Sequence, residues 1–314
     1  MVESQQWLTL LSNGIASASH LSPVRHRLVK SPYLPTCFLF DNGSLRAAST
    51  LNLRVVAKAL EGVIGAPVKA VSLLHSSGVD AEELGGERAQ LLEPALNEWL
   101  AAGAKGPAVL LPFFFGPSAA LTVYVPERVA ALRAKFPDAQ LEQAGWLVDI
   151  GWADDRVAAA LAEAVRATIR REKLKSAKVV VVDHGSPLRG VAQVRDHLAC
   201  QVAGLLGAEV AEVSMASMES REGAEYAFNR PLLAERLRAA PFDAGDVVLA
   251  LQFLSPGRHA GAGGDIAEIC EAAKVERPGL RTWMTETIGA DARVISVLAE
   301  RYRAAVARID DQRG

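Results

Sequence analysis

Apolar runs of strand length alternate along the 314-residue chain with longer segments whose apolar residues recur at helical spacing. The pattern predicts strands at Thr36–Phe40, Val68–Leu74, Ala108–Phe115, Lys178–Val182, Val210–Met215 and Asp246–Leu254. It predicts helices at Leu45–Ile64, Glu82–Ala102, Val191–Leu206, Arg221–Ala239 and Ala290–Ile309. Continuous apolar strands that alternate with helices are typical of βαβ units, whose parallel sheets are covered by helices on both faces. The expected fold class is therefore α/β.

The chain also contains an internal repeat. Residues 41–72 can be laid over residues 183–214 without a gap, which places the tetrapeptide DNGS of the first half on DHGS of the second. A later pair of matching segments begins at Ile150 and Ile288. The repeat predicts two related α/β domains. The expected parts are an N-terminal extension at 1–35, a degenerate domain at 36–172 and a second domain at 173–314, with the charged stretch 170–175 as linker.

The two halves differ at the strand ends, which is where ligands bind in parallel α/β sheets. In the second half, the residues that follow the first three strands include His184, Glu219 and His259. In the alignment of the two halves, the corresponding residues of the first half are Asn42, Ser77 and Ala119. The sequence therefore predicts a site in the second half that the first half lacks.

Two imidazoles and a carboxylate suit a borderline divalent cation such as Co²⁺, Fe²⁺, Ni²⁺ or Zn²⁺. A neutral imidazole also accepts a proton near pH 7. The alternative is that His184 and His259 are ordinary hydrogen-bonded loop histidines, but both stand at strand ends and both are missing from the first half. His75 and His197 are expected to have no chemical role.

Composition and charge exclude several classes of protein. Half of the residues are apolar and the net charge is −2, which indicates a packed core and no surface for nucleic acid. The three scattered cysteines lack the spacing of a disulfide framework or a metal knuckle, which favours a reducing cytoplasm. The uncharged run at 106–126 contains four prolines, and the N-terminus lacks a basic region, so neither a membrane span nor a signal peptide is predicted.

The second half resembles the sirohydrochlorin cobaltochelatases and ferrochelatases, the CbiX/SirB type of class II tetrapyrrole chelatase. The resemblance rests on a strand that ends in His-Gly-Ser at 184–186, on the acidic segment 216–219, and on Phe-Leu-Ser-Pro-Gly-Arg-His followed by Asp-Ile within 252–266. It is weaker over 36–170, where the histidines are missing. The glycine-rich loop at 261–264 is longer than in the family pattern, and a proline expected soon after Glu219 is absent.

The resemblance implies a two-domain chelatase with a cleft between its halves. It implies ATP-independent insertion of Co²⁺ or Fe²⁺ into sirohydrochlorin, a lyase reaction, for cobalamin or sirohaem synthesis. His184, His259 and Glu219 would bind the metal, and the histidines would accept pyrrole protons. Ser186, Gly185, Arg189 and Arg258 would bind the substrate carboxylates. The metal is a substrate, so no further cofactor is implied, and a tandem chain is consistent with a monomer.

Other functions are open at this point. A non-catalytic tetrapyrrole- or metal-binding protein would keep the cleft without the activity. A nucleotide-binding protein would use the glycine-rich segment 261–264, but this segment does not follow the first strand, as a phosphate loop does. A serine hydrolase is disfavoured because no Gly-x-Ser-x-Gly segment occurs. The aromatic run Phe113–Phe115 is expected in the core, with one ring facing a bound macrocycle as the alternative.

Overall fold

Two parallel four-stranded sheets form the framework of the structure, a computed structural model that describes residues 34–104, 106–151, 153–261 and 263–312. The first sheet contains β1 (Thr36–Asp41), β2 (Val68–Ser72), β3 (Ala108–Pro112) and β4 (Leu141–Gln143), in the order β2-β1-β3-β4. The second contains β5 (Lys178–Asp183), β6 (Glu212–Ser217), β7 (Gly245–Leu251) and β8 (Leu280–Met284), in the order β6-β5-β7-β8. Every strand pair is parallel, which confirms the α/β fold class. The expected N-terminal extension lies outside the described residues except for its last two.

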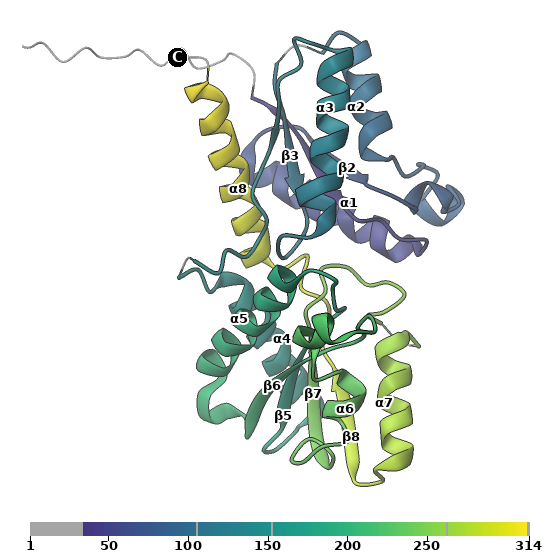
Figure 1. The fold of residues 1–314 in the computed structure, drawn as a ribbon, viewed down its shortest axis with the longest axis vertical. Coiled ribbons are helices and arrows are strands. Elements are labelled where there is room, and N and C mark those ends of the chain that lie inside the picture. Colours follow the sequence, from purple (N-terminus) through teal and green to yellow (C-terminus); the bar gives the residue numbers. More distant parts are fainter. Residues whose placement is uncertain (1–33, 105, 152, 262, 313–314) are drawn as a thin grey trace, which may run out of the picture. The chain divides into compact units, whose positions relative to one another are not determined.

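Helices cover both faces of each sheet (Figure 1). They are α1 (Ala47–Ile64), α2 (Leu92–Ala101), α3 (Val125–Lys135), α4 (Arg156–Glu172), α5 (Arg189–Leu206), α6 (Leu233–Arg236), α7 (Asp265–Glu276) and α8 (Ala292–Asp311). Alternate residues of the central strands enter different cores, as the period of two requires. Val179 and Val181 of β5 belong to one cluster shared by the two halves, and Val180 and Val182 belong to a cluster within the second half.

The last helix of each half packs on the other half. Helix α4 follows the first sheet in the chain but lies against α5 and β7, and α8 lies against α1 and β3. Tyr302 of α8 donates a hydrogen bond to the carbonyl of Pro35 just before β1, over 2.6 Å. Arg301 donates to the carbonyls of Trp146 and Leu147 in the first half. The boundary expected at 172/173 therefore divides the chain but not the packing. Helix α4 precedes the boundary and packs on the second half, and α8 follows it and packs on the first half.

Two predicted helices are wrong over much of their length. The segment predicted as a helix at Arg221–Ala239 forms a 3₁₀ helix at Ala224–Asn229 and the single turn α6, since Pro231 cannot continue a helix. The segment predicted at Glu82–Ala102 is an α-helix only from Leu92, because Gly85 and Gly86 adopt positive φ angles that end a short 3₁₀ turn. The charged stretch at 170–175 is partly helical, because α4 extends to Glu172. Strands β4 and β8 and helices α4 and α7 were not predicted from the pattern.

The strand register corrects the alignment of the two halves. Helices α1 and α5 both have 18 residues, but a 3₁₀ turn of three residues, Gly207–Glu209, precedes β6. Ser72 pairs with Asp41 in the first sheet, and Ser217 pairs with Asp183 in the second, so Ser72 corresponds to Ser217. Leu74 donates a backbone hydrogen bond to residue 42, and Glu219 donates the equivalent bond to residue 184. The first-half counterpart of Glu219 is therefore Leu74, and not Ser77 as the gap-free alignment had it.

Candidate functional site

The three predicted ligand residues of the second half lie at the carboxyl ends of adjacent strands. His184 follows β5, Glu219 follows β6 and His259 lies in the loop after β7. The imidazole rings of His184 and His259 lie 4.6 Å apart between centroids, at an interplanar angle of 72°. The Nε2 atom of His184 is 3.7 Å from Oε1 of Glu219. The fold thus brings together residues that are 75 positions apart in the chain, from 184 to 259.

Hydrogen bonds define which ring nitrogen of each histidine is available. Nδ1 of His184 lies 3.1 Å from the carbonyl oxygen of Gly185, and Nδ1 of His259 lies 2.6 Å from Oδ2 of Asp265. Carbonyl and carboxylate oxygens only accept, so both Nδ1 atoms donate and a neutral ring keeps its lone pair on Nε2. A carboxylate behind an imidazole is the partner that orients metal-binding histidines in proteins. The sequence motif contains Asp265 without indicating its role, and the structure shows it as the hydrogen-bond partner of His259.

Gly185 has a structural role in the turn. Its φ angle is +94°, and a Cβ atom there would lie 2.0 Å from the carbonyl oxygen of Glu219. The glycine lets the chains after β5 and β6 approach closely, which brings Glu219 to His184. Gly43 has the same role in the first half, with φ +87° and a Cβ position 1.7 Å from the carbonyl oxygen of Leu74.

The hydroxyl group of Ser186 is used within the turn. It accepts a hydrogen bond of 3.1 Å from the amide of Leu188, at the start of α5. The buried side chain of Asn229 holds the backbone of Ser186 at both its N–H and its C=O, over 3.2 and 2.9 Å. Asn229 was not predicted, because it lies in a segment that the pattern assigned to a helix.

The two predicted substrate-binding arginines differ in their surroundings. The guanidinium of Arg189 lies over the ring of Phe228, 5.0 Å from its centroid. Arg258 has a side chain that is 74% exposed, and its Nε atom is 3.5 Å from Oδ2 of Asp265. Both side chains belong to loops or helix starts at the same strand ends as the histidines.

A buried polar network holds the strand end that carries His184. Asp183 accepts a 2.6 Å hydrogen bond from the hydroxyl of Ser217, and this hydroxyl accepts a 2.5 Å bond from Arg195. The guanidinium of Arg195 is 3.7 Å from the Asp183 carboxylate and also donates to the carbonyl of Phe228. Burial raises the pKa of Asp183, and Ser217 and Arg195 lower it. The sequence signal for this network was a charged residue, Arg195, within the apolar stripe of α5.

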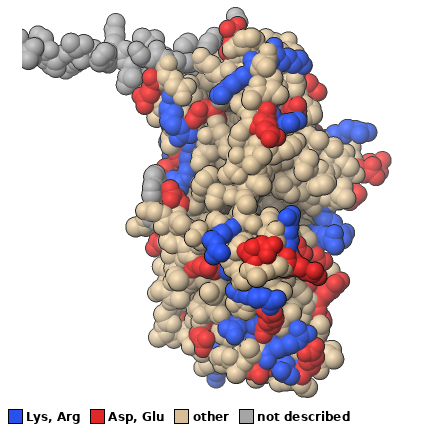
Figure 2. Space-filling view, in the orientation of Figure 1, with Lys and Arg blue, Asp and Glu red and all other residues tan. Residues whose placement is uncertain are grey.

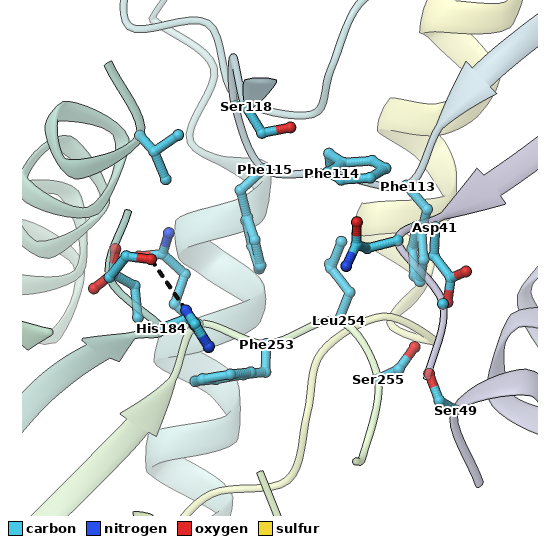
Figure 3. A pocket seen from close by; sticks show the side chains of 17 residues that line it. Asp41, Ser49, Phe113, Phe114, Phe115, Ser118, His184, Phe253, Leu254 and Ser255 are labelled. Atoms are coloured by element: carbon cyan, nitrogen blue, oxygen red, sulfur yellow. Dashed lines mark hydrogen bonds between the residues drawn. The ribbon is translucent and has the colours of Figure 1, made fainter. Parts of the chain in front are cut away.

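A pocket of about 310 Å³ adjoins His184 and is lined by both halves (Figure 3). The first half contributes Asp41, Asn42, Gly43, Ser49, Ser118 and the segment 113–116, and the second contributes Asp183, His184, Gly185, Val191 and the segment 252–255. Asn52 of α1 donates to the carbonyl of Leu254 and the hydroxyl of Ser255, over 3.0 and 2.8 Å. Figure 3 shows Phe115 extending toward the segment that carries Phe253 and Leu254. Phe113 is buried, whereas Phe114 and Phe115 are partly exposed to the pocket.

Metal-binding capacity in the described parts of the chain is limited to pairs of side chains. No group of three or more His, Cys, Asp or Glu residues is arranged there to hold a metal ion. Glu219 is 64% exposed and approaches His184 alone. The arrangement therefore offers two imidazoles to an incoming ion, and the other coordination positions have to be filled by water or by another ligand.

The glycine-rich loop does not form a phosphate site in its described part. The amides of Asp265 and Ile266 at the start of α7 donate to the carbonyls of Arg258 and His259, so they do not face a ligand. Asp265 and Glu268 place negative charge in the first turn of this helix, which opposes anion binding. Ala262 lies outside the described residues. Figure 2 shows acidic and basic side chains interspersed over the visible face, and the net charge of the chain is −2.

None of the helices in the described ranges has both the length and the apolar character needed to cross a membrane. The buried thiols of Cys37 and Cys270 and the exposed thiol of Cys200 are all unpaired.

The chain is similar to known proteins in sequence over its second half and in fold over both halves. The CbiX family model matches residues 178–305. No curated protein matches the chain. Among solved structures, SirB from Bacillus subtilis with Fe³⁺ has a TM-score of 0.62 at 16% identity, covering 88% of this chain and 98% of that one. The sirohydrochlorin chelatase SirB from Bacillus subtilis subspecies spizizenii in complex with cobalt has a TM-score of 0.62 at 14% identity, with the same coverage.

A third structure, CbiX described as the terminal enzyme of sirohaem biosynthesis in denitrifying bacteria, has a TM-score of 0.53 at 13% identity, covering 86% of this chain and 99% of that one. The family match begins at β5 and contains all three predicted ligand residues. The structural matches extend over the first half as well. The CbiX match therefore covers only the second half of this chain, whereas the two halves together share the fold of SirB and CbiX.

Proposed function

We propose that this chain is a sirohydrochlorin chelatase, which inserts Co²⁺ or Fe²⁺ into the macrocycle without ATP. The observation that carries the proposal is the pair of imidazoles 4.6 Å apart beside a pocket shared by the two halves. The CbiX match over residues 178–305 and the fold shared with SirB support it. The proposal includes the use of the metallated product in cobalamin or in sirohaem synthesis. It also includes a cytoplasmic location for the protein.

In this proposal, His184 and His259 hold the metal ion through their Nε2 atoms. Asp265 accepts a hydrogen bond from Nδ1 of His259 and so orients the ring with Nε2 toward the ion. Glu219 lies next to Nε2 of His184 and supplies a carboxylate oxygen to the ion. A small protein ligand set suits an ion that has to be transferred, because the pyrrole nitrogens then replace water more easily than they would replace tightly held side chains.

The macrocycle would occupy the pocket between the halves. The partly exposed rings of Phe115 and Phe253 provide flat apolar contacts. The exposed guanidinium of Arg258 is placed to bind a carboxylate of the substrate. Arg189 contributes more weakly, since Phe228 already contacts its guanidinium. The sequence predicts that Ser186 and Gly185 bind the substrate. In this proposal they contribute only indirectly, by forming the turn after β5.

Metal insertion can be measured anaerobically, by following the absorbance of sirohydrochlorin after Co²⁺ or Fe²⁺ is added. We expect acceleration over the spontaneous reaction, and a loss of about 100-fold or more in His184→Ala and in His259→Ala. His197→Gln is the matched control, because His197 lies on α5 away from the strand ends. Wild-type protein that gives no acceleration would rule out the enzyme, and histidine variants with normal rates would rule out the site.

A second candidate is a tetrapyrrole- or metal-binding protein without chelatase activity. The observation that favours it is the ligand set, in which Glu219 is largely exposed and, within the described ranges, no third ligand completes the pair of histidines. This candidate predicts tight binding of the macrocycle with no change in the rate of metal insertion. The same titration separates the two functions.

A further inference from the structure

A buried carboxylate of the first half lies in the wall of the same pocket. Asp41 ends β1 and is only 9% exposed, and its Oδ1 atom has no hydrogen-bond partner. The pocket that it lines also contacts His184 of the second half. Figure 3 shows Asp41 and Ser49 on one side of this pocket and His184 on the other.

Asp41 differs from its counterpart Asp183 in having no cation beside it. Asp183 is accompanied by Arg195, the seventh residue of α5, and the seventh residue of α1 is Leu53. No ion pair to Asp41 occurs among the described residues, and burial raises the pKa of Asp41 to about 6, although Ser72, Ser49 and the Gly43 amide lower it in part. A buried carboxylate with no cation beside it is costly to the fold, which marks it as a candidate functional group.

The charged groups on the elements around Asp41 are engaged elsewhere or exposed. Arg54 of α1 donates to the carbonyls of Leu84 and Glu87, and Lys58 pairs with Glu61. Lys69 of β2 lies over the ring of Phe38, and β3 carries no charged residue. Arg46 precedes α1 and is exposed. The titratable groups that share the pocket with Asp41 are Asp183 and His184.

We propose that Asp41 accepts a pyrrole N–H proton of the macrocycle, from the face opposite the metal-holding histidines. The inference rests on the proposed function. Insertion of M²⁺ into the free-base macrocycle breaks two N–H bonds, and each nitrogen keeps the electron pair that it donates to the metal. One proton passes to the Asp41 carboxylate, which becomes a carboxylic acid and releases the proton to solvent when the product leaves. The second proton passes to water.

Other polar groups of the pocket are less suited to this role. The Oε1 atom of Gln252 is also buried and without a partner, but an amide oxygen accepts a hydrogen bond and does not take a proton. Asp183 also has a buried oxygen without a hydrogen-bond partner, Oδ2, but its charge is compensated by Arg195 and Ser217. The hydroxyl of Ser49 and the amide of Asn42 are neutral. Asp41 is thus the one pocket-lining carboxylate in the described residues that has no cation beside it.

The test compares two forms of the ligand, because only the free base has N–H groups. Dissociation constants for metal-free sirohydrochlorin and for its cobalt complex are measured with wild type, Asp41→Asn and Asp80→Asn, in buffer with a chelator. We expect Asp41→Asn to bind the free base about tenfold more weakly and the cobalt complex as wild type does. Asp80 is an exposed carboxylate of the same half, and its variant should match wild type for both ligands. Asp41→Ser serves as a second variant and should behave as Asp41→Asn does.

The outcomes separate this proposal from the proposed function. Unchanged binding of the free base in both Asp41 variants, or equal weakening for both ligands, would overturn the role of Asp41 while metal insertion by wild type stands. Selective weakening for the free base, without insertion by wild type, would uphold the contact of Asp41 with the N–H group and overturn the enzyme. Wild-type protein that binds neither ligand would overturn both.

Discussion

The two halves of the chain have the same backbone arrangement at the end of their first strand but carry different side chains there. In each half the first strand ends in an aspartate paired with a serine of the next strand, and a glycine follows two residues later. The second half adds His184, Glu219 and a buried arginine, where the first half has Asn42, Leu74 and Leu53. The difference shows that the scaffold does not depend on the ligand residues, so their presence in one half points to chemistry.

The largest expected effect comes from giving the second half the residues of the first. The registers of β3 and β7 align Pro117 with Pro256. In this alignment the first-half counterpart of His259 is Ala120, which corrects the Ala119 expected from the sequence. The double variant His184→Asn/His259→Ala should lose metal insertion by about 1,000-fold or more, because both imidazoles are removed. The circular dichroism and the unfolding midpoint should stay close to those of wild type, since Asn42 and Ala120 are tolerated in the same fold. A variant that inserts metal at the wild-type rate would contradict the comparison.

The buried ion pair between Arg195 and Asp183 can likewise be replaced by the residues of the first half. Arg195→Leu copies Leu53 and leaves Asp183 buried beside Ser217 without its cation. The free energy of unfolding should fall by about 3 to 5 kcal/mol, measured by urea denaturation at pH 7.5. The double variant Arg195→Leu/Asp183→Asn should recover part of this loss, because the uncompensated charge is then removed. If the single and double variants are equally unstable, the cost arises from lost packing instead.

Asp41→Asn should stabilise the protein at neutral pH. The folded-state pKa of Asp41 is raised to about 6 from the ordinary value of 3.8, so the folded state binds the proton more tightly than the unfolded state does. The free energy of unfolding of wild type therefore falls as the pH rises from about 4 to about 6, and the penalty is complete above that range. The variant should be more stable by about 3 kcal/mol at pH 7.5 and should match wild type near pH 3.

Denaturation curves at several pH values measure this difference, with Asp80→Asn as the exposed control. A stability gain that is equal at all pH values would mean that the Asp41 charge is not its cause. A gain at neutral pH combined with weaker binding of the free base would show that the first half keeps a costly carboxylate for function.

The smallest expected effect concerns Glu219. Glu219→Leu copies Leu74 and should reduce metal insertion by about tenfold, less than either histidine variant, because this side chain is 64% exposed. Glu219→Gln should fall between this variant and wild type if the carboxylate acts as a ligand. An effect as large as that of His184→Ala would show that Glu219 has a greater role in holding the metal than its exposure indicates.

The fold class and the histidine pair followed from local signals in the sequence. Buried parallel strands have apolar residues on both faces, so β1, β3, β5 and β7 are continuous apolar runs. The histidines stand directly at or shortly after the ends of such runs, and parallel topology places those ends at one edge of the sheet. The predicted helix at Arg221–Ala239 failed because helical spacing of apolar residues outweighed the proline within it.

The sequence by itself determined the duplicated α/β framework, the strand ends and the half that carries the imidazoles. Only the tertiary structure decided that Glu219 corresponds to Leu74, that Arg195 compensates Asp183 and not Asp41, and that α4 and α8 are exchanged between the halves. The physical reason is that periodicity reports which face of an element is apolar. It does not report which distant element covers that face, and the protonation of a buried carboxylate depends on the groups that do.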